Sequence, residues 1–584
     1  MQSTRNSIPA AQGMSAMPPM RIGIDIGGTH SDGVLMQGAK LLAAAKGRTR
    51  HDDLLASINL LLEHLLAGRD ASLVQYINLS TTLTTNAIIT DKVAPVAVLV
   101  SAGPGIAVEN YNIGDQFYHV AGSLNHVGLE TSPTEPDELA AVLGRCRGQG
   151  ISHFAVVGKF SPRNPEHELQ MATAVKVGAT VVCCGHQLSG RLNFGRRINS
   201  TYFNAAVWGI ARSFAEALQQ SLHKFGLAHA EVNILKADGG TLPLSRALDA
   251  PVQSILSGPA ASVMGILATM PVQEDVVLLD IGGTTTDIAL FAGGQPLLER
   301  EGIVIAGRPT LVRALRVTSI GIGGDSLIHI DADGAVRCGP QRLGPCMAAG
   351  GSVPALMDAF NLLGHANFAD AAASKAGLAA FAAQHNVNPE ALAQATLNAA
   401  ADAIDTAVSE LIDQVNSKPV YTIHEILEER RIEPKQMLLI GGPAEAFQPL
   451  LGQKTGMETC CPPHAGVTNA IGAALCRSTS ALVLHADTSR GSLNVPTLEV
   501  SKRIARNFTL EDAVSEAKNL LYSDMAALGL ELDEADVQIT QADSFNMVES
   551  GYTMGKNIRV SVQVKPAVLA QAEAAAGLEV ILAG

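Results

Sequence analysis

Apolar residues follow two spacings along this chain, and the two spacings predict different elements. Val96–Val100 and Phe154–Val157 are uninterrupted apolar runs, which is typical of strands buried on both faces of a sheet. Residues 54–66 instead place apolar side chains at helical spacing, which predicts an amphipathic helix. Runs of the two kinds alternate through most of the chain, so the sequence favours an α/β fold.

Three longer helices are also expected. One begins at Asn388, because Asn is a favoured N-cap and Pro389 suits the first helical position, and it runs to about Val415. Another covers residues 510–528. The third covers residues 199–225, and its apolar face consists of Tyr202, Phe203, Val207, Ile210, Phe214 and Leu218.

These patterns divide the chain into four parts. Residues 1–19 lack the apolar run of a signal peptide, and we expect them to form a disordered lead-in. Residues 20–190 and 191–480 are expected to form two related α/β domains with a cleft between them. Residues 481–584 predict a small α+β region that includes an alternating strand at residues 558–564.

Composition narrows the class of protein. Hydrophobic residues make up 47% of the 584 residues and charged residues 16%, which is enough apolar material for several packed cores. The net charge of −14 argues against a nucleic-acid partner, and no apolar run is long enough to span a membrane. We therefore expect a cytoplasmic protein. Its eight cysteines contain no Cys-x-x-Cys pair, so zinc and iron–sulfur signatures are missing.

One motif occurs twice. Asp-Ile-Gly-Gly-Thr starts at Asp25 and again at Asp280, each time between two apolar, strand-like runs. Paired glycines let a hairpin approach an anion closely, and its exposed N–H groups bind phosphate. A carboxylate beside a phosphate needs a cation between them, so Asp25 and Asp280 predict a Mg²⁺ site. A single copy is equally compatible with a plain glycine turn, but two copies in one context favour hairpins that hold a phosphate chain.

Commoner phosphate-binding motifs do not explain these hairpins. The chain has no Gly-x4-Gly-Lys-Ser/Thr string of the Walker type. A dinucleotide fingerprint would lead from a strand into a helix, whereas both copies here lead back into a strand.

The doubled hairpin resembles the actin/hexokinase/Hsp70 superfamily, in which two such hairpins hold the phosphates of ATP and a Gly-Gly turn lies near the adenosine. The resemblance implies two actin-like (ribonuclease H-like) ATPase domains, with ATP and Mg²⁺ as cofactors and Asp25 and Asp280 as catalytic and metal-binding residues. The nucleotide-binding residues that it implies are Gly27, Gly28, Thr29, Gly282, Gly283, Thr284, Thr285, Gly323 and Gly324, with Gly441 and Gly442 at the adenosine. Asp32 and Asp287 are expected to stabilise their own hairpins.

A set of short strings narrows the resemblance. In order they are residues 84–87 (Thr-Thr-Asn-Ala), 163–168 (Arg-Asn-Pro-Glu-His-Glu), 199–205, 238–240, 256–261 and 319–326. Together they resemble the A subunit of the hydantoinase/oxoprolinase family, of the N-methylhydantoinase A type. This resemblance implies ATP-dependent opening of a cyclic amide such as a hydantoin, 5-oxoproline or a lactam, through phosphorylation of the ring carbonyl. It also implies a separate B subunit as partner.

Three positions depart from the usual pattern of that family. His30 replaces a phenylalanine in the first hairpin, and Asp238 replaces an asparagine before two glycines. Asp325 replaces a glycine, which is expected to lose a left-handed backbone conformation and to add negative charge near the nucleotide. These departures leave the identity of the substrate open.

Three further residues are candidates for the substrate pocket, each with a structural alternative. Thr85 and Asn86 follow a predicted strand, and they either line the pocket or cap a helix that runs to Ile89. His167 either acts on substrate or metal in the cleft, or lies at the start of a helix capped by Asn164 and points outward.

Two other functions remain compatible with the same ATP-binding residues. One is an ATP-dependent carboxylase component or small-molecule kinase, which would phosphorylate a different acceptor. The other is a non-catalytic nucleotide-binding switch, which would bind ATP without an acceptor.

Overall fold

A computed structural model of the protein describes residues 18–50, 53–114, 116–299, 301–417, 431–549, 552–573 and 581–583. Most of the expected lead-in, residues 1–17, lies outside the described residues.

Two sheets of the same topology form the centre of the molecule. In each, an antiparallel hairpin is extended by an antiparallel strand on one side and by two parallel strands on the other. The first sheet has the order β12-β11-β4-β1-β2-β3-β28 and the second β15-β14-β13-β21-β22, with β18 also paired to β14. The predicted α/β class is therefore confirmed, and the doubled motif coincides with a repeated strand order.

The strands of the first sheet are β1 (Met20–Ile26), β2 (His30–Gln37), β3 (Lys40–Arg48), β4 (Val74–Thr81), β11 (Glu231–Leu235), β12 (Thr241–Pro243) and β28 (Ile581–Ala583). Those of the second are β13 (Val276–Ile281), β14 (Thr286–Ala292), β15 (Gln295–Pro296), β18 (Val317–Ile320), β21 (Gln436–Ile440) and β22 (Glu458–Cys460). Strands β11 and β12 follow residue 190 yet belong to the first sheet, so a boundary there would divide this sheet between two parts of the chain.

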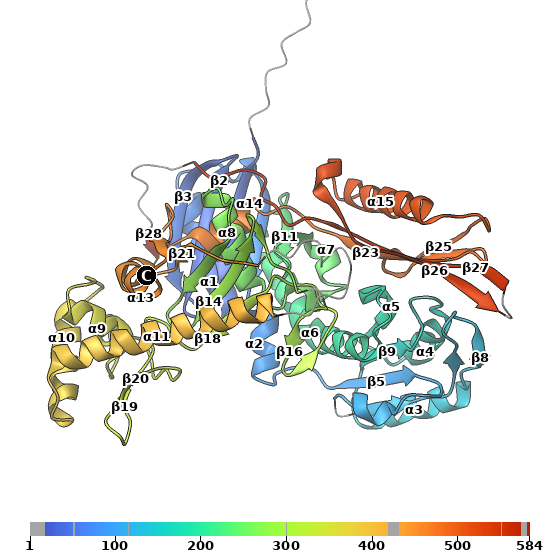
Figure 1. Ribbon diagram of the computed structural model, residues 1–584, viewed down its shortest axis with the longest axis horizontal. Helices are drawn as coiled ribbons and strands as arrows, with labels where there is room; N and C mark the ends of the chain where they lie inside the picture. The colour runs from blue at the N-terminus through green and yellow to red at the C-terminus, as the bar shows by residue number, and fades with distance from the viewer. Residues whose placement is uncertain are drawn as a thin grey trace, which may run out of the picture.

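Two helices, α8 (Ser257–Thr269) and α14 (Thr468–Leu475), lie between the two sheets (Figure 1). They cross so closely that a Cβ atom on Gly265 would lie 2.3 Å from the carbonyl oxygen of Thr468. A Cβ on Gly23 of β1 would likewise lie 2.1 Å from the carbonyl oxygen of Ala470 in α14. Glycine is required at both contacts, because a side chain at Gly265 would push α14 away from α8 and one at Gly23 would push α14 away from β1.

Other helices cover the outer faces. Helix α1 (Leu54–Leu66) packs on the first sheet, and α9 (Leu356–Leu362), α11 (Pro389–Asn416) and α13 (Ala444–Thr455) pack on the second, with α10 (Ala371–Gln384) beyond them. The bounds of α1 are as predicted. The predicted N-cap of α11 is also present, because Asn388 accepts a hydrogen bond from the Ala391 N–H.

A third sheet is entirely parallel and has the order β10-β9-β5-β6. Its strands are β5 (Val96–Ser101), β6 (Gln116–His119), β9 (His153–Gly158) and β10 (Val181–Cys184). Helices α3 (Pro136–Gly148) and α4 (Glu166–Lys176) cover one face and α6 (Phe194–Lys224) covers the other. The predicted burial of β5 and β9 is confirmed, because both faces of this sheet are covered.

Helix α6 begins before the predicted Asn199, because Asn193 is the N-cap and accepts from the Arg196 N–H. The first part of α6 packs on the parallel sheet and its last part, around Leu218 and Leu222, on the first sheet. Helix α6 thus connects the parallel sheet with the first sheet.

The C-terminal part is an antiparallel sheet, β25-β24-β23-β27-β26, with helix α15 (Leu510–Ala526) on one face (Figure 1). Its strands are β23 (Ala481–Asp487), β24 (Ser492–Val495), β25 (Val500–Arg503), β26 (Val537–Glu549) and β27 (Tyr552–Val564). The predicted helix and strand are present, although α15 ends before Leu528 and β27 begins well before residue 558. Among the described residues, no helix combines the length and the apolar composition of a membrane span.

Candidate active site

The two glycine hairpins meet at their tips. In the first, the Gly27 N–H donates to the His30 carbonyl at 3.1 Å, and in the second the Gly282 N–H donates to the Thr285 carbonyl at 2.9 Å. The hydroxyls of Thr29 and Thr284, 255 residues apart in the chain, lie 3.4 Å from one another. The folded chain therefore brings both predicted phosphate hairpins into one site.

A glycine loop supports the second hairpin. The Gly324 N–H donates to the Gly282 carbonyl at 3.0 Å, and the Asp325 N–H donates to the Gly283 carbonyl at 2.7 Å. A Cβ on Gly323 would lie 2.6 Å from the Thr284 nitrogen, so the loop runs directly against the hairpin backbone.

The third glycine element joins the same site. Gly441 has a φ of +95°, and a Cβ there would lie 2.2 Å from the Ile281 carbonyl oxygen and 3.0 Å from Asp280 Oδ1. Gly442 faces open space. This turn links β21 to α13 and borders the end of β13, so the structure brings all three predicted glycine elements together.

Asp25 and Asp280 share one hydrogen-bond donor. The side-chain amide of Asn469, from α14, lies 3.3 Å from Asp25 Oδ2 and 3.0 Å from Asp280 Oδ2. Ser262 of α8 also donates to Asp280 Oδ2, at 2.5 Å. The two helices between the sheets thus hold the two carboxylates in place. Asn469 and Ser262 carry no recognisable motif, so the sequence did not indicate their part in the site.

Asp25 is buried with one oxygen unsatisfied. Its Oδ1 atom has no hydrogen-bond partner among the described residues. Burial raises the pKa of Asp25 to about 7, against a hydrogen bond from Ser80 and together with the charges of Asp32 and Asp280. A buried carboxylate beside other carboxylates, with a free oxygen, matches what a divalent cation requires of its ligands.

The second aspartate of each hairpin contacts the neighbouring strand. Asp32 accepts from Lys46 of β3 at 2.7 Å, and burial nevertheless raises its pKa. Asp287 lies opposite Ser319 of β18, and burial and the charge of Asp280 raise its pKa to about 7 against a hydrogen bond from Ser319. These contacts join each hairpin to the adjacent strand, and the stabilisation of the hairpins by Asp32 and Asp287 stays a prediction.

The three departures from the family pattern have different surroundings. Asp325 does not have a left-handed conformation, so the expected loss of backbone freedom does not apply, and its Oδ2 accepts from Arg342 at 2.9 Å. Partial burial and the charges of Lys46, Arg48 and Arg342 lower the pKa of His30 to about 4.

Asp238, the third residue that departs from the family pattern, is buried. It accepts from Lys236 at 3.2 Å, from Thr479 at 3.1 Å and from the Gly240 N–H at 3.0 Å. Asp238 therefore ties the end of β11 to the segment that precedes the C-terminal sheet.

Thr85 and Asn86 lie in the first turn of helix α2 (Leu83–Ile89), whose N-cap position is Thr82. The capping alternative is therefore wrong for both. The Thr85 hydroxyl accepts from the Leu256 N–H at 3.1 Å, and Asn86 donates to the Thr82 hydroxyl at 3.2 Å. Their role in a substrate pocket stays a prediction.

His167 does not point outward, as its position in a first turn had suggested. It is fully buried, with Nδ1 3.1 Å from the Ser101 hydroxyl and Nε2 2.9 Å from Glu130. Helix spacing places His167 on the same face of α4 as the buried Met171 and Val175, and this face packs on the parallel sheet.

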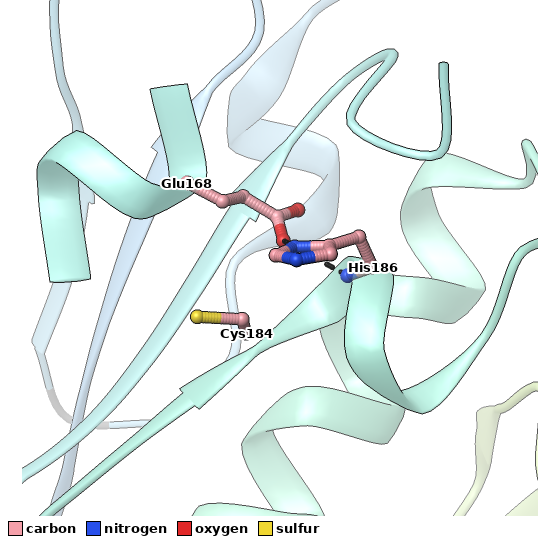
Figure 2. Close-up of side chains that lie close together, drawn as sticks. All are labelled: Glu168, Cys184 and His186. Atoms are coloured by element: carbon pink, nitrogen blue, oxygen red, sulfur yellow. Dashed lines mark hydrogen bonds and ion pairs between the residues drawn. The ribbon is translucent and has the colours of Figure 1, made fainter. Parts of the chain in front are cut away.

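Close to His167 lies a buried group that was not predicted, Glu168, Cys184 and His186 (Figure 2). Their potential ligand atoms lie within 4.8 Å of one another. The Glu168 carboxylate, however, already accepts from two backbone N–H groups, of Gly158 and His186, and from His186 Nδ1 at 2.5 Å. Burial raises the pKa of the Cys184 thiol, with a further contribution from the Glu168 charge. A satisfied carboxylate and a protonated thiol indicate a structural contact between α4 and helix α5 (Gly185–Leu188).

Comparison with known proteins gives two matches to family models. The hydantoinase/oxoprolinase model matches residues 197–481, and the model of the hydantoinase/oxoprolinase N-terminal region matches residues 21–177. Together the two models cover both hairpins and the glycine turn at Gly441. The C-terminal sheet follows the matched residues.

The individual proteins similar to this chain share about a quarter of its residues over the aligned part. The caprolactamase subunit alpha of Pseudomonas jessenii is 27% identical over 72% of this chain and 64% of its own length. The acetophenone carboxylase gamma subunit of Aromatoleum aromaticum is 24% identical over 59% of this chain and 53% of its own length. The matched part thus spans less than two thirds of either relative. The crystal structure of the ATP-dependent caprolactamase from Pseudomonas jessenii superimposes with a TM-score of 0.69 at 19% identity, covering 93% of this chain and 87% of that one, which shows a shared fold.

Proposed function

This chain belongs to the hydantoinase/oxoprolinase family, and on that premise we propose that it is an ATP-dependent hydrolase of cyclic amides. One observation carries the proposal: two hairpins of phosphate-binding type meet beside two carboxylates, the buried Asp25 and the half-buried Asp280, which share the Asn469 amide. The proposed substrate is a hydantoin, 5-oxoproline or another lactam, and the similarity to a caprolactamase subunit supports this class. Because relatives are named as subunits, we propose a B subunit as partner. The cytoplasm, where ATP is abundant, is the proposed compartment.

ATP is proposed to bind across the two sheets, in the manner of two actin-like domains around a cleft. Backbone N–H groups in glycine turns, together with hydroxyls, favour anions because no side chain blocks the approach. The groups proposed to hold the phosphates are the backbones of Gly27, Gly28, Gly282 and Gly283 and the side chains of Thr29, Thr284 and Thr285. Gly323 and Gly324 support the second hairpin, and the open side of Gly442 is the proposed place of the adenosine.

Asp25 and Asp280 are the proposed holders of Mg²⁺. The unsatisfied Oδ1 of Asp25 fits a cation, and a positive charge would relieve the repulsion between the neighbouring carboxylates. When bound, Mg²⁺ supplies charge neutralisation for a phosphoryl group in transfer. Asn469 and Ser262 fix the directions of the two carboxylates.

The chemical need for ATP follows from the substrate. An unstrained amide carbonyl is a poor electrophile, so water attacks it slowly. Transfer of the terminal phosphoryl group forms a bond from the carbonyl oxygen to phosphorus and breaks the bond from phosphorus to ADP. Water then adds to the ring carbon, the C–N bond breaks as the nitrogen takes up a proton, and a second water hydrolyses the resulting acyl phosphate to a carboxylate and phosphate. For this chain the task is mainly positioning and charge neutralisation, which a site built largely of backbone N–H groups can supply.

A carboxylase component is the second candidate, favoured by the similarity to an acetophenone carboxylase subunit. The same residues would bind ATP, and the phosphorylated acceptor would be an enolate or bicarbonate in place of an amide.

ATP turnover against a panel of acceptors tests the proposal. We would measure ADP release with 5-oxoproline, hydantoins, lactams and small ketones, with and without a B subunit of the family. Ring-dependent turnover that Asp280→Asn abolishes and that the exposed control Asp137→Asn retains is the expected result. Ketone-dependent turnover would favour the carboxylase. Turnover that ignores every acceptor would refute both.

A further inference from the structure

Asp325 places a carboxylate where the two hairpins meet. A Cβ atom built on Gly283 would lie 3.1 Å from Asp325 Oδ2 and 3.1 Å from the Thr29 hydroxyl oxygen. The same Oδ2 accepts from Arg342 Nη2 at 2.9 Å, and Oδ1 accepts from the Cys346 N–H at 2.9 Å. An internal anion therefore lies beside Gly283 of the second hairpin, at the residue that Thr29 of the first hairpin also approaches.

Not all N–H donors of the Arg342 guanidinium are used in hydrogen bonds to the described residues. Its Nε atom is buried without a hydrogen-bond partner among the described residues. Arginine presents several N–H donors in a planar fork that matches a phosphate in bidentate fashion, so a single contact to Asp325 leaves part of that fork unused. A phosphate between the hairpins would offer Arg342 more acceptor oxygens and more charge than the carboxylate does.

Positively charged side chains around the first hairpin are not all paired with carboxylates. Lys46 pairs with Asp32, but Arg48 donates to the Ala349 carbonyl at 3.2 Å and has no carboxylate partner among the described residues. Arg342, Arg48 and Lys46 all act on His30, whose lowered pKa of about 4 keeps it neutral. His30 and Asp325, which are far apart in the sequence, thus lie around the same arginine.

We propose that Arg342 binds the terminal phosphate of ATP, and that Asp325 holds Arg342 in place and competes with that phosphate until ATP binds. This inference rests on the proposed function and deepens it. Two anions beside one another repel, so the terminal phosphate must displace the Asp325 carboxylate from Arg342. ADP lacks that phosphate and does not compete. Asp325 therefore weakens the binding of ATP selectively, and Arg342 strengthens it selectively.

Nucleotide binding by calorimetry tests the proposal on the full chain with Mg²⁺. We would compare the non-hydrolysable analogue AMPPNP with ADP for Asp325→Asn and Arg342→Gln. Asparagine keeps an oxygen for the Cys346 N–H, so the loop is retained while the charge is lost. We expect Asp325→Asn to tighten AMPPNP about tenfold, and Arg342→Gln to weaken it about tenfold or more, with ADP nearly unchanged in both. The gain from Asp325→Asn should vanish in the double variant.

A second pair provides a matched control. Arg337 and Asp331 also lie 2.9 Å apart, on the nearby hairpin of β19 (Ile328–Ile330) and β20 (Val336–Cys338), but at the exposed surface. Asp331→Asn and Arg337→Gln should change neither affinity. If the unmodified chain binds AMPPNP but Asp325→Asn leaves the ratio of AMPPNP to ADP affinity unchanged, the proposed competition is wrong while the proposed function stands. If the unmodified chain binds neither nucleotide, the proposed function itself is wrong.

Discussion

The two hairpins have the same motif and the same strand order, yet their second aspartates meet different neighbours. In the first sheet β3 places Lys46 directly opposite Asp32. In the second, β15 is too short to reach that position, and β18 places Ser319 opposite Asp287. One hairpin therefore carries an ion pair, and the other carries a half-buried carboxylate that faces the Ser319 hydroxyl and the Asp280 charge. A repeated motif determines the backbone of the turn, but the adjacent strand determines which side chain lies opposite the second aspartate of each hairpin.

The first aspartates differ in the same way. Asp280 accepts from both Ser262 and Asn469, whereas Asp25 keeps one oxygen without a partner among the described residues. The second hairpin thus holds its half-buried carboxylate through two donors to one oxygen, Oδ2, and the first buries a carboxylate oxygen that has no donor among the described residues.

The largest effect is expected from removing either first aspartate. Asp25→Asn and Asp280→Asn should each lower acceptor-dependent ATP turnover by about 100-fold or more, because both are proposed to hold Mg²⁺. Their stabilities should differ. Asp25→Asn removes an unsatisfied buried charge and should raise the melting temperature at pH 8 without nucleotide, whereas Asp280→Asn should not. Thermal unfolding beside steady-state turnover checks both, and equal shifts in melting temperature would remove the distinction between the hairpins.

A smaller effect is expected at Asn469, which serves both hairpins at once. Asn469→Ala removes the donor shared by Asp25 and Asp280, so both carboxylates lose their orientation. We expect turnover to fall about 10–100-fold and the Mg²⁺ requirement to rise. The measurement is turnover against Mg²⁺ concentration, with the exposed Asn398→Ala of α11 as control. An unchanged Mg²⁺ dependence would show that the shared amide has no part in metal binding.

The smallest effect concerns stability against pH. The folded-state pKa of Asp25 and of Asp287, about 7 in each case, lies above the ordinary 3.8. The folded chain thus binds more protons than the unfolded chain between about pH 4 and 7, and the contribution of these groups to the free energy of unfolding falls as pH rises through that window.

Exchanging the opposing residue sharpens this comparison. Ser319→Lys would give Asp287 the partner that Lys46 gives Asp32, and the reduced pKa should flatten the pH dependence of denaturant midpoints. Asp287→Asn should flatten it equally. A slope that neither variant alters would show that Asp287 does not titrate in this range.

Local sequence was sufficient where a single chemical signal decides a local structure. The apolar spacing of α1, the Asn388–Pro389 start of α11 and the glycine hairpins are examples, and each was found as predicted. The start of α6 was misplaced, because its cap at Asn193 precedes the motif that drew the prediction. The outward orientation predicted for His167 was wrong, because its place in the first turn was weighed and its shared face with Met171 and Val175 was not.

By itself, the sequence determined that this protein has an α/β fold with two glycine hairpins, each with an aspartate in front, because turns and strand propensities act over a few residues. Only the tertiary structure decided that Asn469 joins the two aspartates, that Arg342 meets Asp325, and that Lys46 and Ser319 lie opposite equivalent positions. Such contacts join residues far apart in the chain. The Asn469 contacts depend on how α14 packs between the two sheets, the positions of Lys46 and Ser319 depend on strand register, and no local spacing records either.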